Sequence, residues 1–242
     1  MPGLLNPVVL RITLRATIGR KRALVFLIVP VVLLVITVTL KLVANSPVWP
    51  AEFLGVFGFS VVLPLTALII GTSVLGAEID DGSIVAMLAT PVSRTSVVLS
   101  KFAAAVVLTV MFGALPEYLA AGVARGFGGK LALGLLAGAL VASVAYNALF
   151  VMLSVLTTRA IAVGLLYLLV WEGLLGNLVG GVRILSIGQY SVSVANSITH
   201  ASALNAHLTT TTAIVMAVAV TAVTLVIAAR RLSAFSIKGD AV

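Results

Sequence analysis

The sequence contains no cysteine and only two histidines, His200 and His207, in 242 residues. Disulfides, thiolate catalysis and metal sites with cysteine ligands are therefore excluded, and little remains from which to build any other metal site. Charged residues are scarce at 9%, against about 25% in an ordinary soluble domain. Hydrophobic residues make up 61%, more apolar side chain than a soluble fold can cover. The bilayer must be the solvent for most of the chain.

Motifs of common membrane and ATP-dependent enzymes are also missing. No G-x-x-x-x-G-K-[ST] sequence occurs, so the chain has no phosphate-binding loop with which to hydrolyse ATP. No H-E-x-x-H or G-x-S-x-G sequence occurs, which argues against a membrane protease. We therefore expect no enzymatic activity in the chain itself, and no catalytic, cofactor-binding or metal site.

Apolar runs predict six transmembrane helices, because a helix needs about 20 apolar residues to cross the hydrocarbon core. The predicted spans are 23–43, 53–77, 98–123, 131–157, 160–182 and 208–229. The expected fold class is an all-α integral membrane protein, with one transmembrane domain over residues 1–242.

Basic residues predict the orientation of these spans. With the N-terminus in the cytoplasm, 11 of the 15 Lys and Arg residues fall on the inside and 4 on the outside. That is a strong positive-inside bias, so both termini are expected to be cytoplasmic, with 230–242 as a cytoplasmic tail. The net charge of +8 then reflects basic residues that face anionic lipid, and no nucleic-acid partner is expected.

Residues 1–22 are predicted to contain an amphipathic helix at the membrane interface. Asn6-Pro7 offers a cap followed by proline at the first helical position. Apolar residues then follow at helical spacing, while Arg11 and Arg15 lie one turn apart on another face. The alternative is a disordered basic leader that only sets the topology.

Two segments between the spans carry further structure. In the cytoplasmic segment 78–97, Asp81 or Ser83 can cap a short helix that ends before Pro91. Its apolar residues lie on one face, so it must dock on lipid headgroups or on a cytoplasmic protein. The outer segment 183–207 is too apolar for a free linker and is expected to fold back as short helices or a re-entrant piece.

Two carboxylates lie inside the predicted spans, Glu172 in the fifth and Glu117 in the third. A buried carboxylate is costly, so each must face a partner, a cavity or water, or carry a proton. For Glu172, a substrate or proton pathway and a structural hydrogen-bond clamp are both open. For Glu117, beside Pro116 and nearer the outer interface, the structural interpretation is favoured. Glycines four residues apart, at 134 and 138 and at 176 and 180, predict close helix packing within one subunit.

Several motifs in sequence order resemble the ATP-binding-cassette (ABC) permeases of the type 2 exporter class. The motifs are Glu78…Asp81-Gly82-Ser83-Ile84…Thr90-Pro91-Val92-Ser93-Arg94…Lys101, Leu156-Thr157-Thr158-Arg159, Leu165…Trp171-Glu172-Gly173-Leu174-Leu175, Arg183-Ile184-Leu185-Ser186-Ile187-Gly188-Gln189-Tyr190 and Arg231-Leu232…Phe235…Gly239-Asp240. Together they cover nearly the whole chain. The chain departs from the pattern at Ser83, where threonine is usual.

The resemblance implies a half-transporter that forms the pathway for ATP-driven export across the cytoplasmic membrane of a prokaryote. Two copies of a cytoplasmic ATP-binding subunit would bind ATP and Mg²⁺, and a second permease copy or a paralogue would complete the complex in the lipid. The segment after the second span would act as the coupling helix, through Glu78, Asp80, Asp81, Gly82, Ser83, Ile84, Met87, Leu88, Pro91 and Arg94. The alternative function is a proton- or ion-coupled secondary transporter or channel that uses Glu172.

Overall fold

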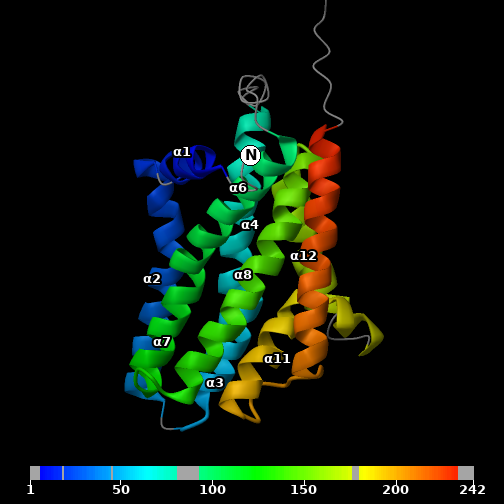
Figure 1. Cartoon of the computed structure of the whole chain (residues 1–242). Helices are drawn as coiled ribbons and strands as arrows, with labels where there is room; N and C mark the ends of the chain where they lie inside the picture. The colour runs from blue at the N-terminus through cyan, green and yellow to red at the C-terminus, as the bar shows by residue number, and fades with distance from the viewer. Residues whose placement is uncertain (1–5, 18, 45, 81–92, 176–179, 234–242) are drawn as a thin grey trace, which may run out of the picture.

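Figure 1 shows the computed structural model of the chain, which describes residues 6–17, 19–44, 46–80, 93–175 and 180–233. These residues fold into helices joined by turns. In chain order the elements are α1 (Pro7–Thr17), α2 (Arg20–Val43), α3 (Trp49–Phe53), η1 (Leu54–Val62), α4 (Leu63–Asp80), α6 (Arg94–Thr109), η2 (Val110–Ala114), α7 (Leu115–Arg125), α8 (Lys130–Leu156), α9 (Ala160–Leu166), η3 (Tyr167–Leu175), η4 (Gly180–Leu185), α11 (Ile187–Thr199) and α12 (Thr210–Ser233). The segments η1, η2 and η3 are π-helical, and η4 is a 3₁₀ helix.

Within the described residues, five helices are long and apolar enough to cross a membrane. They are Phe26–Val43, Trp49–Gly76, Arg94–Arg125, Lys130–Leu156 and Thr210–Ser233. They overlap five of the predicted spans, so the chain is a helical, multi-pass membrane protein. The predicted fifth span, 160–182, contains a shorter apolar helix at Ala160–Leu174, and the count of six remains a prediction.

Two spans contain a wide π-helical segment just before a proline: η1 precedes Pro64, and η2 precedes Pro116. A proline ring lacks an N–H and collides with the carbonyl four residues earlier. In a π turn the hydrogen bond reaches back five residues, as from Leu63 N to Gly58 O, and the helix can continue. The third span is therefore one continuous helix through Glu117.

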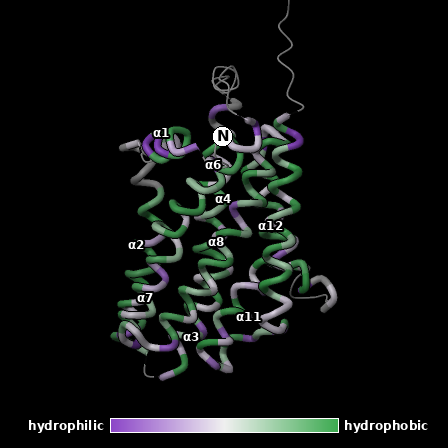
Figure 2. The backbone as a smooth tube through the Cα atoms, in the orientation of Figure 1, coloured by the Kyte–Doolittle hydropathy of each residue, from purple (hydrophilic) through white to green (hydrophobic). Residues whose placement is uncertain are grey.

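The bundle has two distinct ends (Figure 1). At one end lie α1, which runs across the helices beside the start of α2, and the last turn of α12. At the opposite end lie α3 and α11, with the turn between α7 and α8. The first and last described residues thus lie at the same end of the bundle. That this end faces the cytoplasm remains a prediction. Figure 2 shows hydrophobic residues along the length of the bundle, with hydrophilic ones in α1 and near the ends.

Helix α8 is central and packs against α4, α6, α7, α11 and α12. Most of its buried residues are small: Ala132, Gly134, Gly138, Ala139, Ala142, Ser143, Ala145, Ala148 and Ser154. A Cβ on Gly134 would lie 2.8 Å from the carbonyl oxygen of Ala195 in α11. A Cβ on Gly138 would lie 2.9 Å from Phe59 Cζ in η1. The predicted close packing at the first glycine pair is confirmed; residue 176 of the second pair lies outside the described residues.

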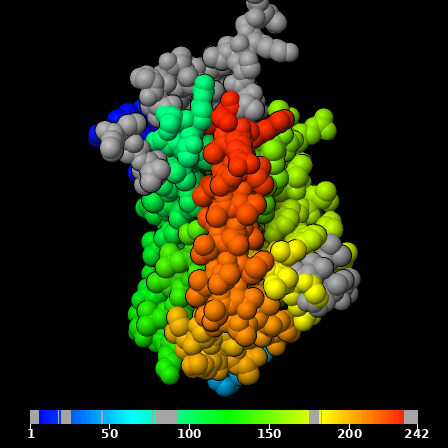
Figure 3. Space-filling view, turned by 45° about the vertical axis from the view of Figure 1, so that its right-hand side comes forward, coloured from blue at the N-terminus to red at the C-terminus, as the bar shows by residue number. Residues whose placement is uncertain are grey.

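Helix α12 lies on the outside of the bundle, and Figure 3 shows it running along the height of one face. Its outward side chains are apolar, with Val215 59% and Val218 64% exposed. In a membrane protein such side chains face lipid, where their exposure carries no penalty. The polar chemistry of the chain therefore has to be sought inside the bundle and at its ends.

Candidate functional site: the cavity beside Glu172

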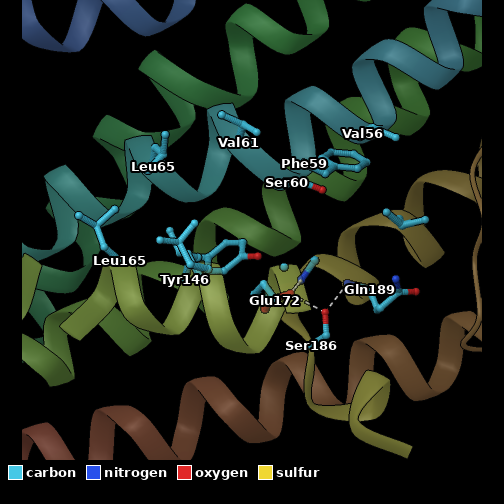
Figure 4. Close-up of a pocket in the computed structure, with 15 residues that line it drawn as sticks. Val56, Phe59, Ser60, Val61, Leu65, Tyr146, Leu165, Glu172, Ser186 and Gln189 are labelled. Carbon is cyan, nitrogen blue, oxygen red and sulfur yellow. Dashed lines mark hydrogen bonds between the residues drawn. The ribbon is translucent and has the colours of Figure 1, made fainter. Parts of the chain in front are cut away.

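A cavity of about 400 Å³ lies between the second span, α8, the apolar helix Ala160–Leu174 and α11. Figure 4 shows Glu172, Ser186 and Gln189 on one side of it, with Val56, Phe59 and Ser60 of η1 across from them. Most of the remaining lining is apolar. Two π-helical segments, η1 and η3, contribute to its walls, and such wide turns often occur at functional sites.

Glu172 accepts four hydrogen bonds at the edge of this cavity. Its Oε1 accepts from Tyr167 Oη at 2.9 Å and from the N–H of Ile187 at 2.8 Å. Its Oε2 accepts from Ser186 Oγ at 2.5 Å and from the N–H of Gly188 at 3.3 Å. A carboxylate has about four acceptor positions, so the acceptor capacity of this group is filled.

Three of the four donors to Glu172 come from the N-terminus of α11, where the first N–H groups have no partner within the helix. Ser186 is the N-cap, and its Oγ also accepts from the N–H of Gln189 at 3.2 Å. The positive end of the helix dipole favours a negative group at this place. Glu172 thus fastens η3 to α11 across 14 residues of chain, and this geometry favours the hydrogen-bond clamp over the proton pathway.

Tyr190 fixes the segment before α11. Its hydroxyl donates to the carbonyl oxygen of Ile184 at 2.8 Å. Burial, and to a lesser extent the charge of Glu172, raises the pKa of Tyr190 to about 12, so the hydroxyl remains a donor at neutral pH. Segment 183–207 thus contains the end of η4 and the helix α11, which packs against α8, and its place on the outer side remains a prediction.

Glu117 has the opposite environment. Its side chain is fully buried, and neither carboxylate oxygen has a hydrogen-bond partner within the described part of the chain. It lies against Gly58 of η1, where a Cβ would come within 2.8 Å of Glu117 Cδ. The described residues thus supply no hydrogen-bond clamp of the kind that the sequence led us to expect for Glu117.

An ion pair with a buried lysine connects the last turn of α4 to the middle of α6. Lys101 Nζ donates to Glu78 Oε1, and the lysine side chain is only 1% exposed. The two residues lie on either side of residues 81–92, so the pair joins the helices that this segment connects. Lys101 was not among the expected site residues. A basic residue at the start of one span, after an acid at the end of the preceding span, is the signal that could have identified it.

The sequence matches the family described as ABC-2 family transporter protein over residues 19–182, which is more than half of the chain. The chain belongs to the ABC-2 transporter family. No curated protein matches it. A chain of this family is the membrane component of an ABC transporter and not its ATPase. The match includes the ion pair, Glu117 and Glu172, whereas α1, α11 and α12 lie outside it.

In this ABC-2 permease, α1 is tied to α6 beside the ion pair. Asn6 Oδ1 accepts from the N–H of Val8 at 3.0 Å, which is the predicted cap, and the N–H of Asn6 donates to Ser100 Oγ at 2.8 Å. Ser100 is buried and next to Lys101. Arg11 and Arg15 are exposed. The helix itself is observed, and its position at the membrane interface remains a prediction.

The structure describes only part of the predicted coupling segment of the permease. Glu78 and Arg94 are described, and the backbone of Asp80 ends α4. Ser93 caps α6 by accepting from the N–H of Ser96 at 3.2 Å. The other expected coupling residues lie outside the described residues: Asp81, Gly82, Ser83, Ile84, Met87, Leu88 and Pro91.

Proposed function

We propose that this chain is the permease subunit of an ATP-driven exporter in the cytoplasmic membrane of a prokaryote. Membership of the ABC-2 family carries the proposal, and the apolar helices of the bundle support it. Two copies of a separate ATP-binding subunit would bind ATP and Mg²⁺ and supply the energy. A second permease copy or a paralogue would complete the complex.

The segment Glu78–Arg94 is the proposed joint with the ATP-binding subunit. The ion pair between Glu78 and Lys101 supports this role, because it joins α4, which leads into the segment, to α6, which follows it. A displacement of the segment would then be passed to α4 and α6 together. Through Ser100, α6 also holds α1, so the N-terminal helix would move with the same unit.

The cavity beside Glu172 is the proposed part of the translocation pathway within this chain. Its apolar walls and few polar groups are typical of a site for a small molecule. Gln189 lines the cavity, and its buried side-chain oxygen has no hydrogen-bond partner within the described residues, so a rotation of this side chain into the cavity would let the oxygen accept from a cargo molecule. A cargo with an apolar body and one N–H or O–H donor fits these features.

The proposal is tested by co-expressing the tagged chain with a P-loop ATPase encoded beside it. We expect the ATPase to co-purify, and inside-out vesicles to accumulate cargo only with ATP and Mg²⁺. Met87→Asp and Leu88→Asp should abolish both co-purification and stimulated ATPase activity, because a charge would replace the apolar ridge of the joint. The matched control is Thr158→Asp in the turn between α8 and α9, which should keep both.

The same vesicles separate the two candidate functions. Uptake driven by a proton or ion gradient without ATP would contradict the exporter and support a secondary transporter. Full coupling in both joint variants would mean that this segment is not the contact with the ATPase, while leaving the ATP-dependence of transport intact.

A further inference from the structure

The strongest feature that the proposed function leaves unused is Glu117. Its side chain is 0% exposed, and both carboxylate oxygens lack a hydrogen-bond partner within the described residues. Buried polar groups in native proteins almost always have such a partner. A fully buried carboxyl group without a donor therefore points to something that the protein alone does not supply.

The carboxyl group fills a notch at Gly58. A Cβ built on Gly58 would overlap Glu117 Oε1 and lie 3.3 Å from Oε2, so only glycine leaves room for the group at this place. The notch lies in the π-helical segment η1, and η2 ends three residues before Glu117. Neither segment contains an ionisable residue. The part of the surroundings of the Glu117 carboxyl group that η1 and η2 form therefore carries no charge.

The other elements packed against α7 are α2, α3 and α8. The ionisable side chains on these elements and on α7 itself are Arg20, Lys21, Arg22 and Lys41 on α2, Glu52 on α3, Tyr118 and Arg125 on α7, and Lys130 and Tyr146 on α8. Lys41 is the basic residue of α2 nearest this end of α7, and its Nζ donates to the carbonyl oxygen of Val123 at 2.6 Å. None of the described side chains among them hydrogen-bonds to Glu117.

The depth of Glu117 makes an isolated charge unfavourable. It lies eight residues before Arg125, the last residue of the third span, which corresponds to about 12 Å along a helix. At this depth, burial of an ionised carboxylate without a counter-charge is strongly disfavoured. The neutral acid avoids that penalty.

We propose that Glu117 is a proton-binding site of the permease: it carries a proton in the closed packing of α7 against η1 and can release it only when water enters between them. The released proton passes to that water and leaves a carboxylate. Opening of the contact at Gly58 and ionisation of Glu117 are then linked, so each favours the other. The inference needs no ATPase partner and does not rest on the proposed export function.

Infrared spectroscopy of the full-length permease in lipid vesicles at pH 7 tests this directly, because a neutral carboxylic acid and a carboxylate absorb at separate frequencies. Labelling with ¹³C-glutamate restricts the signal to four residues, Glu52, Glu78, Glu117 and Glu172. We expect one isotope-shifted band of a neutral acid. It should be lost in Glu117→Gln and kept in the matched control Glu172→Gln.

Three results would overturn the proposal. The first is the absence of a neutral-acid band in the wild type. The second is a band that persists in Glu117→Gln, or in Glu117→Leu should the glutamine variant not fold. The third is a band that disappears when sodium replaces potassium at constant pH, since the site would then hold a metal cation. None of these measurements depends on cargo or ATP, so they are independent of the outcome for the export function.

Discussion

Glu172 and Glu117 are glutamates in two apolar helices of one bundle, and they differ in whether hydrogen-bond donors surround the carboxylate. Glu172 accepts four hydrogen bonds, two of them from backbone N–H groups at the start of α11. Glu117 accepts none from the described residues and lies against Gly58. A carboxylate in a membrane protein can therefore hold two segments together or remain without a partner, and its own residue type does not decide between them.

The largest difference between the two sites is expected when each carboxylate is replaced by leucine. Glu172→Leu would leave Tyr167, Ser186 and two backbone N–H groups without their acceptor, and we expect a loss on the order of 3 kcal/mol in unfolding free energy. Glu117→Leu removes no hydrogen bond, so its stability should stay within about 1 kcal/mol of the wild type or rise. Thermal unfolding of both variants in detergent measures the difference. Equal losses in the two variants would remove the distinction between the sites.

A smaller loss is expected from filling the notch. Gly58→Ala places a methyl group against Glu117, and overpacking of this kind costs about 1–3 kcal/mol. The loss should shrink in a Glu117→Ala background, because the methyl group then has room. The matched control is Gly181→Ala, since a Cβ on Gly181 has no atom within 4 Å. A loss at Gly58 that is the same in both backgrounds would mean that the two residues do not compete for this space.

Glutamine should destabilise the protein at position 172 and leave its stability almost unchanged at position 117. In Glu172→Gln an NH₂ group replaces one of the two acceptors, and we expect a loss of about 1–2 kcal/mol with folding retained. Glu117→Gln resembles the protonated acid and should stay within about 0.5 kcal/mol of the wild type. Transport assays across a pH range add the functional comparison. Unchanged transport by Glu172→Gln would leave that residue a purely structural role.

The smallest expected effect is the removal of a single donor. Tyr167→Phe deletes the hydroxyl that binds Glu172 Oε1, which should cost about 1 kcal/mol because three other donors remain. Tyr118→Phe is the matched control beside Glu117, with an expected change below about 0.5 kcal/mol. If the control loses as much stability as Tyr167→Phe, the hydroxyl of Tyr167 contributes nothing specific to the clamp.

Much of the fold could be predicted because it depends on local composition. Long apolar runs identified the helices that can cross a membrane, and five of the six predicted spans contain one. The cap at Asn6-Pro7 needs only neighbouring residues, and the structure confirms it. The close packing at Gly134 and Gly138 also follows from two small residues on one helix face.

The environments of the carboxylates could not be predicted in the same way. The apolar run 160–182 suggested one span through Glu172, but nothing in that run indicates that Ser186 would donate a hydrogen bond to the carboxylate. For Glu117 the deciding neighbour, Gly58, lies in another span. The ion pair of Glu78 with Lys101 likewise joins two helices across a connecting segment.

The sequence by itself determined that this chain is a membrane protein, which of its segments are helical and where its charged residues are concentrated. These properties follow from the free energy of transferring each segment out of water. Only the tertiary structure decided which carboxylate meets a helix N-terminus and which meets a glycine notch. That choice depends on how separate helices are placed against one another. A hydrogen bond is made or lost over less than 1 Å, and no pattern along a single helix specifies a distance of that kind to a residue on another.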